Sequence, residues 1–397
     1  MERKSEETRV KRTVCYFIKK GGRKMERKNQ FLFALCLALA GALAFLVTPT
    51  MAAEKPQKIE LKMSSVWSSG IQLIEVDRHF VKLVNSMGGD DFKIKFFDGG
   101  TMVPPFEIFD TVARGTLDMG GDWGGYWAGK DEVFNIIGSY PLGLTVHDYM
   151  IWVYQGGGFD LIQEAYGKHG LVALPFGGHA SESGIRGNKP INTINDFKGM
   201  KIRIGGKLQG KILKDLGGVQ VNLAGSEVYQ ALEKGVIDAC EYNIPSVDLM
   251  MGLQEISKYW ASPAWHAPAA IFSVLINKKA WDKFSPEQKE MLKAAAMANF
   301  LWSYTFLEYN NIAATKAFLD KGIKITRLSN ADLEKIQKLV NKHTVESCIG
   351  NPLFAKVAYS QYKYLQDFSQ WRSISQPFSH GRNVALPDMD AIKAAIK

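Results

Sequence analysis

Arg203 is the side chain in this 397-residue sequence best suited to holding a small anion. It stands near the end of a strand-like apolar run, in the segment GMKIRIGG that begins at Gly199. A guanidinium offers a planar fork that matches a carboxylate with two parallel hydrogen bonds, which a lysine ammonium does not. On the local pattern alone a surface arginine is the more economical interpretation, so a binding role depends on the rest of the chain.

Aromatic residues gather after another apolar run. Trp123, Tyr126 and Trp127 closely follow Asp122. Such rings could wall a small-molecule pocket, with the Tyr126 hydroxyl as a polar contact. The same rings could instead fill the core, and both interpretations stay open at this point.

Carboxyl and imidazole groups supply further candidates, although an isolated acid or histidine is more often a structural residue. Glu241 and Tyr242 directly follow the run VIDAC, and His266 lies between two prolines. Glycine pairs such as Gly205-Gly206 fit a cleft where backbone approaches a ligand, and they also fit tight turns. The sequence contains no HExxH, GxSxG, GxxxxGK[ST] or CxxC motif, so it shows no familiar catalytic signature.

The N-terminus is typical of a secretory signal. Arg27 and Lys28 precede an apolar run at 31–47, which ends in TPTMAA. We predict cleavage near Ala52-Ala53 and export to the periplasm, with a retained membrane anchor as the alternative. Met25 begins a signal of ordinary length, so either Met1 or Met25 could be the true start.

The net charge of +9 comes largely from this leader. Residues 1–52 hold 11 basic and 4 acidic residues, and the rest of the chain holds 38 and 36. This near balance of basic and acidic residues argues against a nucleic-acid partner, and so does the lack of a basic stripe with interleaved aromatic residues. The remaining length suits two α/β domains. Only Cys240 and Cys348 remain, which excludes a cysteine metal cluster, and we expect two separate buried thiols.

Strand-like runs alternate with amphipathic helical stretches from Ile59 onward, which is typical of βα units around mostly parallel sheets. The predicted strands are 59–64, 92–97, 117–120, 171–175, 201–204, 219–222 and 237–240. The predicted helices among them are 73–86, 105–114, 208–216 and 226–234. Residues 286–321 predict one long helix after a Ser285 cap, with a possible break at Asn310-Asn311, and the tail after Gln370 is predicted to be a loop.

Several segments, in order, resemble the solute receptors of TRAP (tripartite ATP-independent periplasmic) transporters, in the branch that binds 2-oxoacids and other carboxylates. The matching segments are GGYWAGKDE, PFGGHASESG, INDFKGMKIRIGG, EVYQALEKGVIDACEYNIP and KYWASPAWHAP. They fall within roughly residues 59–342, and their joint order is more specific than any one segment. The resemblance implies an α/β, two-lobed, type II-like periplasmic binding protein with a long helix touching both lobes.

The resemblance also implies that the chain crosses between the lobes more than once. We predict residues 1–52 as leader and signal peptide, 53–177 with 267–306 as lobe I, and 178–266 with 307–350 as lobe II. Residues 351–397 would form a C-terminal helix and tail. The lobes would close over a ligand, and the receptor would deliver it to an ion-gradient-driven membrane permease.

Site residues follow from the same resemblance. Arg203 falls on the arginine that pairs with the ligand carboxylate, and Tyr126 falls on a ligand-contacting tyrosine. We predict Glu241, Glu182 and the Tyr242 backbone as ligands of a Na⁺ or Ca²⁺ ion that bridges protein and ligand. The predicted ligand contacts are Arg203, Glu182, Tyr126, Tyr242, His266 and Trp67.

The sequence departs from the branch at three places: Glu182 replaces a usual Gln, Tyr242 a frequent Trp, and Trp265-His266 a Gly-Trp pair. Glu182 and Glu241 together would set two negative charges against Arg203 and repel an anion. A bound cation, a protonated Glu182 with a raised pKa, or a ligand with its own positive charge would each resolve this. We favour the cation, because the resemblance already implies one.

We therefore predict a receptor, not an enzyme, for a small organic acid, with a 2-oxo or 2-hydroxy monocarboxylate favoured. Two other functions stay as alternatives. One is an exported enzyme that uses Glu182, Glu241 and His266 as acid and base. The other is a sensor subunit that presents its loaded form to a membrane kinase.

Overall fold

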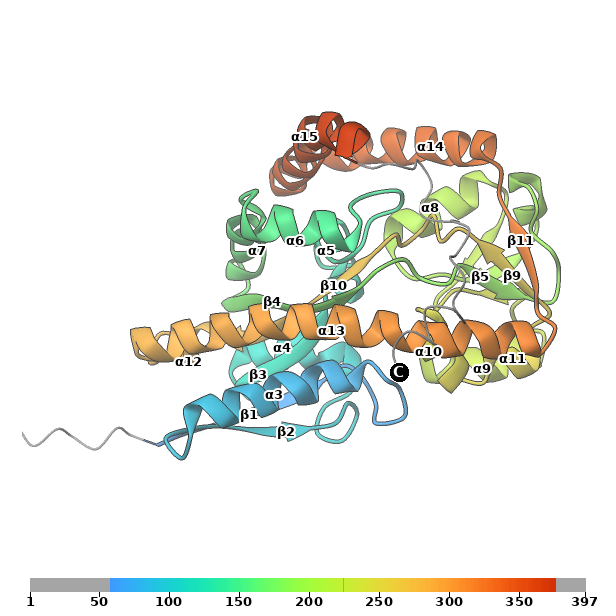
Figure 1. The fold of residues 1–397 in the computed structure, drawn as a ribbon. Helices are drawn as coiled ribbons and strands as arrows, with labels where there is room; N and C mark the ends of the chain where they lie inside the picture. Colours follow the sequence, from blue (N-terminus) through green and yellow to red (C-terminus); the bar gives the residue numbers. More distant parts are fainter. Residues whose placement is uncertain (1–57, 224, 376–397) are drawn as a thin grey trace, which may run out of the picture. The chain divides into compact units, whose positions relative to one another are not determined.

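The computed structural model describes residues 58–223 and 225–375. Within these ranges the strands form two mixed sheets with helices packed around them (Figure 1). None of the described helices is long and apolar enough to cross a membrane. The predicted signal peptide and its cleavage site lie outside the described residues.

Lobe I is built on a five-stranded sheet in the order β2-β1-β3-β10-β4. Its strands are β1 (Ile59–Ser65), β2 (Phe92–Phe97), β3 (Met119–Trp123), β4 (Leu171–His179) and β10 (Ala270–Asn277). β1 pairs in parallel with β2 and β3, whereas β10 runs antiparallel to β3 and β4. Every residue of β10 is buried, as expected for a nearly continuous apolar run in the middle of a sheet.

Lobe II is built on a six-stranded sheet in the order β11-β9-β5-β8-β6-β7. Its strands are β5 (Ile185–Gly187), β6 (Lys201–Arg203), β7 (Val219–Val221), β8 (Ala239–Cys240), β9 (Tyr259–Ser262) and β11 (Lys324–Arg327). β5 runs antiparallel to its neighbours β8 and β9, and the other described pairs are parallel. Both sheets therefore mix parallel and antiparallel pairs.

The helices follow the strands in the alternating manner predicted. Those between the strands of lobe I are α3 (Ile74–Gly88), α4 (Ile108–Arg114), α5 (Val133–Gly138), α6 (Val146–Tyr154) and α7 (Gly158–Gly167), with short 3₁₀ helices η1 (Pro105–Glu107) and η2 (Gly124–Trp127). Those between the strands of lobe II are η3 (Ile194–Phe197), α8 (Lys207–Asp215), α9 (Gly225–Glu233), α10 (Pro245–Met250) and α11 (Leu253–Ile256). After β10 come α12 (Lys278–Trp281) and α13 (Pro286–Asp320), and after β11 come α14 (Asn330–Cys348) and α15 (Pro352–Ser375).

Two short connections carry the chain between the sheets. One joins β4 to β5 and the other joins β9 to β10. They are hydrogen-bonded to each other, since Glu182 N donates to Ala267 O at 3.1 Å. Glu182 and His266, which are far apart in sequence, are neighbours because these connections run together.

Helix α13 contacts both lobes (Figure 1). A capping box of Ser285 and Gln288 starts it, and Pro286 occupies its first turn. In lobe I, Asn299 Nδ2 donates to Phe176 O at 2.8 Å, and in lobe II the Phe318 ring lies 5.7 Å from Trp260. The prediction of one long helix is confirmed, since α13 runs unbroken through Asn310-Asn311, where a break had been possible. Asn311 Oδ1 accepts from Ser246 N at 3.0 Å and ties the helix to α10.

Several element boundaries differ from those predicted. The third strand spans Met119–Trp123 and not 117–120, because its pairing with β10 continues to Trp123. Residues 371–375, which were predicted to be a loop, belong to α15, and the rest of the predicted tail lies outside the described residues. Cys240 and Cys348 are free thiols, as expected, but only Cys240 is fully buried. The lobe boundaries given above stay a prediction.

Asp122 lies fully buried on β3 beside the aromatic cluster. It accepts hydrogen bonds from Trp127 Nε1 at 2.6 Å and Tyr166 Oη at 3.1 Å. Burial raises the pKa of Asp122 to about 7, even though both bonds favour its ionised form. The folded protein therefore holds this proton more tightly than the unfolded chain does.

We expect Asp122→Asn to change how stability depends on pH. The contribution of Asp122 is greatest below about pH 4 and is lost as pH rises through about 7, at about 1.4 kcal/mol per pH unit in that window. Asparagine does not ionise; its oxygen can accept from Trp127, and its NH₂ group can donate to the Tyr166 hydroxyl oxygen. Chemical denaturation from pH 4 to pH 8 should show the variant gaining on the parent as pH rises. Asp90→Asn, whose carboxylate is exposed, is the control, and parallel profiles for all three proteins would contradict the assignment.

Candidate functional site

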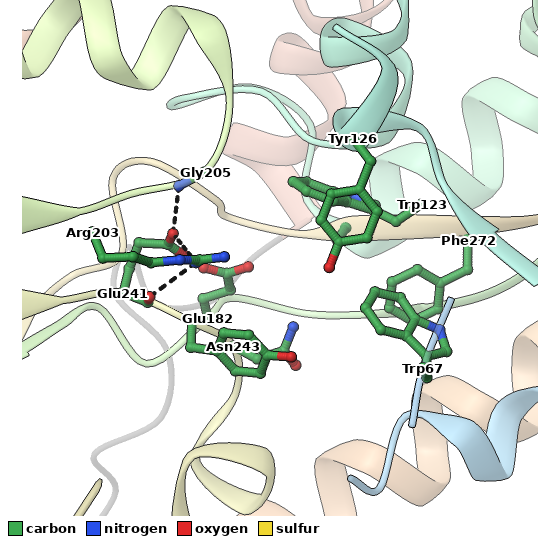
Figure 2. A pocket seen from close by; sticks show the side chains of 11 residues that line it. Trp67, Trp123, Tyr126, Glu182, Arg203, Gly205, Glu241, Asn243 and Phe272 are labelled. Carbon is green, nitrogen blue, oxygen red and sulfur yellow. Dashed lines mark hydrogen bonds and ion pairs between the residues drawn. The ribbon is translucent and has the colours of Figure 1, made fainter. Parts of the chain in front are cut away.

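A small cavity of about 30 Å³ lies where the two sheets face each other. Its lining residues come from both lobes and are Trp67, Trp123, Tyr126, Glu182, Arg203, Gly205, Glu241, Tyr242, Asn243, Ala270 and Phe272. Figure 2 shows labelled aromatic rings on one side of this space and charged side chains on the other. The aromatic side chains of lobe I thus oppose the charged side chains of lobe II.

Arg203 lies at the end of β6, where its neighbours Ile202 and Ile204 point into the core and Arg203 points toward the cavity. Its Nη1 donates to Glu241 Oε1 at 2.6 Å and to Glu241 O at 3.1 Å. Its Nε donates to Leu223 O at 3.2 Å. Among the described residues, 58–223 and 225–375, Nη2 makes no hydrogen bond, which leaves one arm of the guanidinium for a ligand. Part of the Arg203 guanidinium, which we predicted to bind a ligand carboxylate, therefore binds Glu241.

Glu241 follows β8 and is 5 % exposed. Its Oε1 also accepts from Gly205 N at 2.6 Å. Burial alone would raise the pKa of Glu241, but the Arg203 charge and the Gly205 N–H outweigh burial and lower it. Glu241 is therefore the ionised carboxylate of the site.

Glu182 has the opposite electrostatic environment. Its side chain is 7 % exposed, and burial together with the Glu241 charge raises its pKa well above the usual range. Its Oε2 lies 3.0 Å from His266 Nε2, and burial lowers the pKa of His266 to about 4, so that histidine is neutral. Glu182 and Glu241 would set two negative charges against Arg203. Without a cation, the protein avoids this because Glu182 is protonated. A bound cation would compete with that proton for the Glu182 carboxylate.

The Glu182, Glu241 and His266 side chains form a candidate metal centre. Each offers one ligand atom, and these atoms lie within 4.8 Å of one another. Carboxylate oxygens suit hard cations such as Na⁺ or Ca²⁺, whereas an imidazole nitrogen suits them poorly. The donor set therefore fits a cation held by the two carboxylates, with His266 orienting Glu182.

The apolar side of the cavity is a group of aromatic rings in tilted and edge-to-face contact. Trp67 lies 5.4 Å from Phe272 and 5.9 Å from Tyr126, and Trp123 lies 5.0 Å from Tyr126, measured between ring centres. Burial raises the pKa of Tyr126 far above its usual value, so its hydroxyl keeps its proton and can donate. This wall excludes water from one side of a bound molecule.

A second buried arginine, Arg186, lies close to the site in sequence but does not line the cavity. Its Nε donates to Asp248 Oδ2 at 2.7 Å, and its guanidinium carbon lies 3.6 Å from the centre of the Phe318 ring. The guanidinium is thus held between a carboxylate and an aromatic face. Arg186 stabilises the packing of lobe II, and Arg203 is the arginine that meets the cavity.

The structure brings the predicted site residues together. Arg203, Glu182, Tyr126, Tyr242, Trp67 and Glu241 all line the cavity, and His266 lies behind Glu182. The aromatic cluster divides, because Trp123 and Tyr126 line the cavity while Trp127 is buried and bonded to Asp122.

Some lining residues were not predicted to be ligand contacts. Asn243 follows the same strand end as Glu241, so its position could have suggested it. Phe272 and Ala270 lie in the apolar run of β10 and carry no signal in the sequence, because only the return of β10 into lobe I places them at the cavity.

Comparison with known proteins identifies the fold family. The family model for bacterial extracellular solute-binding protein, family 7, matches residues 63–350. A monocarboxylate 2-oxoacid-binding periplasmic protein of Nostoc sp. is 30% identical over 321 residues, which cover 80% of this chain and 87% of that protein.

Solved structures lead to the same family. A TRAP periplasmic solute-binding protein from Pseudoalteromonas atlantica, with bound sodium and pyruvate, has a TM-score of 0.76 and 27% identity over 81% of this chain and 100% of its own. One from Colwellia psychrerythraea, with bound calcium and pyruvate, has a TM-score of 0.74 and 26% identity over 80% of this chain and 98% of its own. The chain therefore belongs to the family-7 extracellular solute-binding proteins, the extracytoplasmic receptors of TRAP transporters, which bind their ligands without catalysis.

Proposed function

We propose that this receptor binds a small 2-oxo or 2-hydroxy monocarboxylate together with Na⁺ or Ca²⁺ and delivers the acid to TRAP permease subunits. The observation that carries the proposal is the convergence of Arg203, Glu241 and Glu182 on one small cavity. The names of the relatives above, which mention 2-oxoacid and pyruvate, agree with this ligand class.

The cavity supports a ligand with few atoms. Its volume of about 30 Å³ is far below the roughly 300–1,000 Å³ of pockets for drug-sized molecules. Nη2 of Arg203 would bind the carboxylate, with Tyr126 donating from the opposite wall. Trp67 and Tyr242 would enclose the body of the acid, and His266 would act through Glu182.

The charges of the site support a bound cation. Arg203 is already paired with Glu241, so an anionic ligand beside Glu182 needs a further positive charge. The Glu241 and Glu182 carboxylates, with the backbone oxygen of Tyr242, would hold the ion. A cation would supply positive charge for both the Glu182 carboxylate and the ligand.

The proposal is tested by the thermal stability of the mature protein with a panel of small acids and their methyl esters. The panel is run after treatment with a chelator and again with added Na⁺ or Ca²⁺. We expect the melting temperature to rise with 2-oxo or 2-hydroxy acids, more strongly with a cation, and not with the esters. A panel without any shift under all ionic conditions would sink the carboxylate proposal.

The N-terminal sequence supports export of the protein. We propose that cleavage near Ala52-Ala53 releases the receptor into the periplasm, where a TRAP receptor meets its permease. Basic residues followed by an apolar run and TPTMAA support this. Intact mass spectrometry of protein from the periplasmic fraction should give a chain that begins at Ala53 or Glu54, and a chain that keeps residues 31–47 would contradict it.

A further inference from the structure

The ring of His179 has its hydrogen placed by its neighbours. His179 ends β4 and is fully buried, and its Nδ1 lies 2.7 Å from Ala180 O. A carbonyl oxygen only accepts, so Nδ1 must carry the hydrogen. Burial lowers the pKa of His179 to about 4, so the ring is neutral and Nε2 can only accept.

This tautomer sets the orientation of the Asn243 amide. Nδ2 of Asn243 lies 3.3 Å from His179 Nε2, and because Nε2 accepts, the amide must turn its NH₂ group toward the histidine. The backbone of Asn243 is also held, since its N donates to Asp248 Oδ1 at 3.1 Å and its O accepts from Ser183 N at 2.9 Å. The backbone position of Asn243 is therefore fixed, and the hydrogen bond to His179 sets which way round the amide lies.

The oxygen of that amide is left without a partner. Asn243 lines the cavity, and within the described residues its Oδ1 is buried and makes no hydrogen bond. A buried acceptor without a donor is costly. The wall of the cavity thus includes a residue with an unpaired acceptor.

We propose that Asn243 Oδ1 accepts a hydrogen bond from the 2-hydroxyl of the ligand, so that this receptor prefers a 2-hydroxy acid to the matching 2-oxo acid. The inference rests on the proposed function and narrows its ligand class. A 2-oxo oxygen at the same place would oppose one acceptor to another and leave both unpaired. Sites that form a hydrogen bond with a ligand hydroxyl discriminate strongly against the analogue without it, because the buried group of the site is then left unpaired. Asn243 is then a ligand contact, and His179 is the residue that positions it.

The test is isothermal titration calorimetry with lactate and pyruvate, which differ only at the second carbon, in buffer with a fixed concentration of Ca²⁺. We expect the parent to bind lactate with an affinity at least about tenfold higher than its affinity for pyruvate. Asn243→Leu, which has no acceptor, should bring the ratio of the two affinities close to one. Ser246→Ala is the control, because Ser246 is buried nearby but does not line the cavity.

His179→Phe gives an independent variant that leaves Asn243 in place. Without the Nε2 acceptor the amide can reverse, so the preference for lactate should shrink while both acids still bind. This variant decides the question if Asn243→Leu does not fold. A ratio that stays at the parent value in the folded variants would overturn the proposal.

Other outcomes separate this inference from the function on which it rests. Equal or tighter binding of pyruvate by the parent would overturn the hydroxyl preference alone. A loss of Ca²⁺ affinity in Asn243→Leu, with the lactate-to-pyruvate ratio unchanged, would make Asn243 a cation ligand and also overturn it. Binding of neither acid would overturn both the proposed function and this inference.

Discussion

Arg203→Ala is expected to weaken binding of a small carboxylate at least tenfold, measured by calorimetry at saturating cation. The substitution removes a charge-assisted hydrogen bond worth roughly 1.5–3 kcal/mol. It also leaves the Glu241 carboxylate facing the ligand without its 2.6 Å partner. The loss of affinity should therefore exceed that from removing an ordinary neutral contact.

The same substitution should lower stability, because removing one partner of a buried ion pair costs roughly 3–5 kcal/mol. Titrations are therefore made at a temperature where the variant is folded. Arg203→Lys keeps a positive charge for Glu241 but loses the planar fork, so we expect an intermediate loss of affinity with little loss of stability. Arg327→Ala, an exposed arginine of lobe II, is the control. Parent-like affinity in both Arg203 variants would exclude Arg203 as the anchor.

Glu182→Gln is expected to reduce the dependence of acid binding on cation. In the parent, Glu182 and Glu241 face one arginine, and we expect Ca²⁺ to strengthen acid binding at least tenfold, or about 1.4 kcal/mol. Without a cation the raised pKa keeps Glu182 protonated and neutral, and glutamine mimics that form but cannot become the second carboxylate that would hold the ion. The variant should therefore bind Ca²⁺ more weakly than the parent and bind the acid about as tightly as the parent when the chelator has removed the cation.

The measurement is a set of acid titrations at several Ca²⁺ concentrations, from chelated to saturated, for both proteins. Glu233→Gln changes an exposed carboxylate of α9 and should behave as the parent does. An unchanged dependence on Ca²⁺ in Glu182→Gln would remove Glu182 from the cation site. If removing the cation with the chelator does not change the affinity of the parent for the acid, the cation has no part in binding.

Three of four polar side chains that line the cavity could be predicted. Arg203 was predicted because the resemblance places it on the arginine that pairs with the ligand, although the local pattern alone favoured a surface arginine. Glu241 was predicted because the resemblance places an acid there, since its position after a strand left a structural role open. Glu182 was predicted only as a departure from the branch pattern. Asn243 was not predicted, since only the tautomer of His179 gives its amide a direction.

The sequence by itself determined the succession of strands and helices, the capped helix that begins at Pro286, and the family to which the chain belongs. These depend on local periodicity, on capping residues and on motifs read in order, all of which act over short stretches of chain. The two-lobed architecture was reached through the resemblance.

The tertiary structure alone decided which groups meet. β10 returns from lobe II and inserts between β3 and β4, and this non-local pairing puts Phe272 and Ala270 on the cavity. The paired connections between the lobes bring Glu182 against His266. Burial and the Glu241 charge raise the pKa of Glu182, whereas the Arg203 charge lowers the pKa of Glu241 despite its burial. We predicted that Arg203 binds a ligand carboxylate with two hydrogen bonds. Its ion pair with Glu241 leaves only Nη2 for the ligand, because a buried charge is unfavourable without a partner of opposite charge.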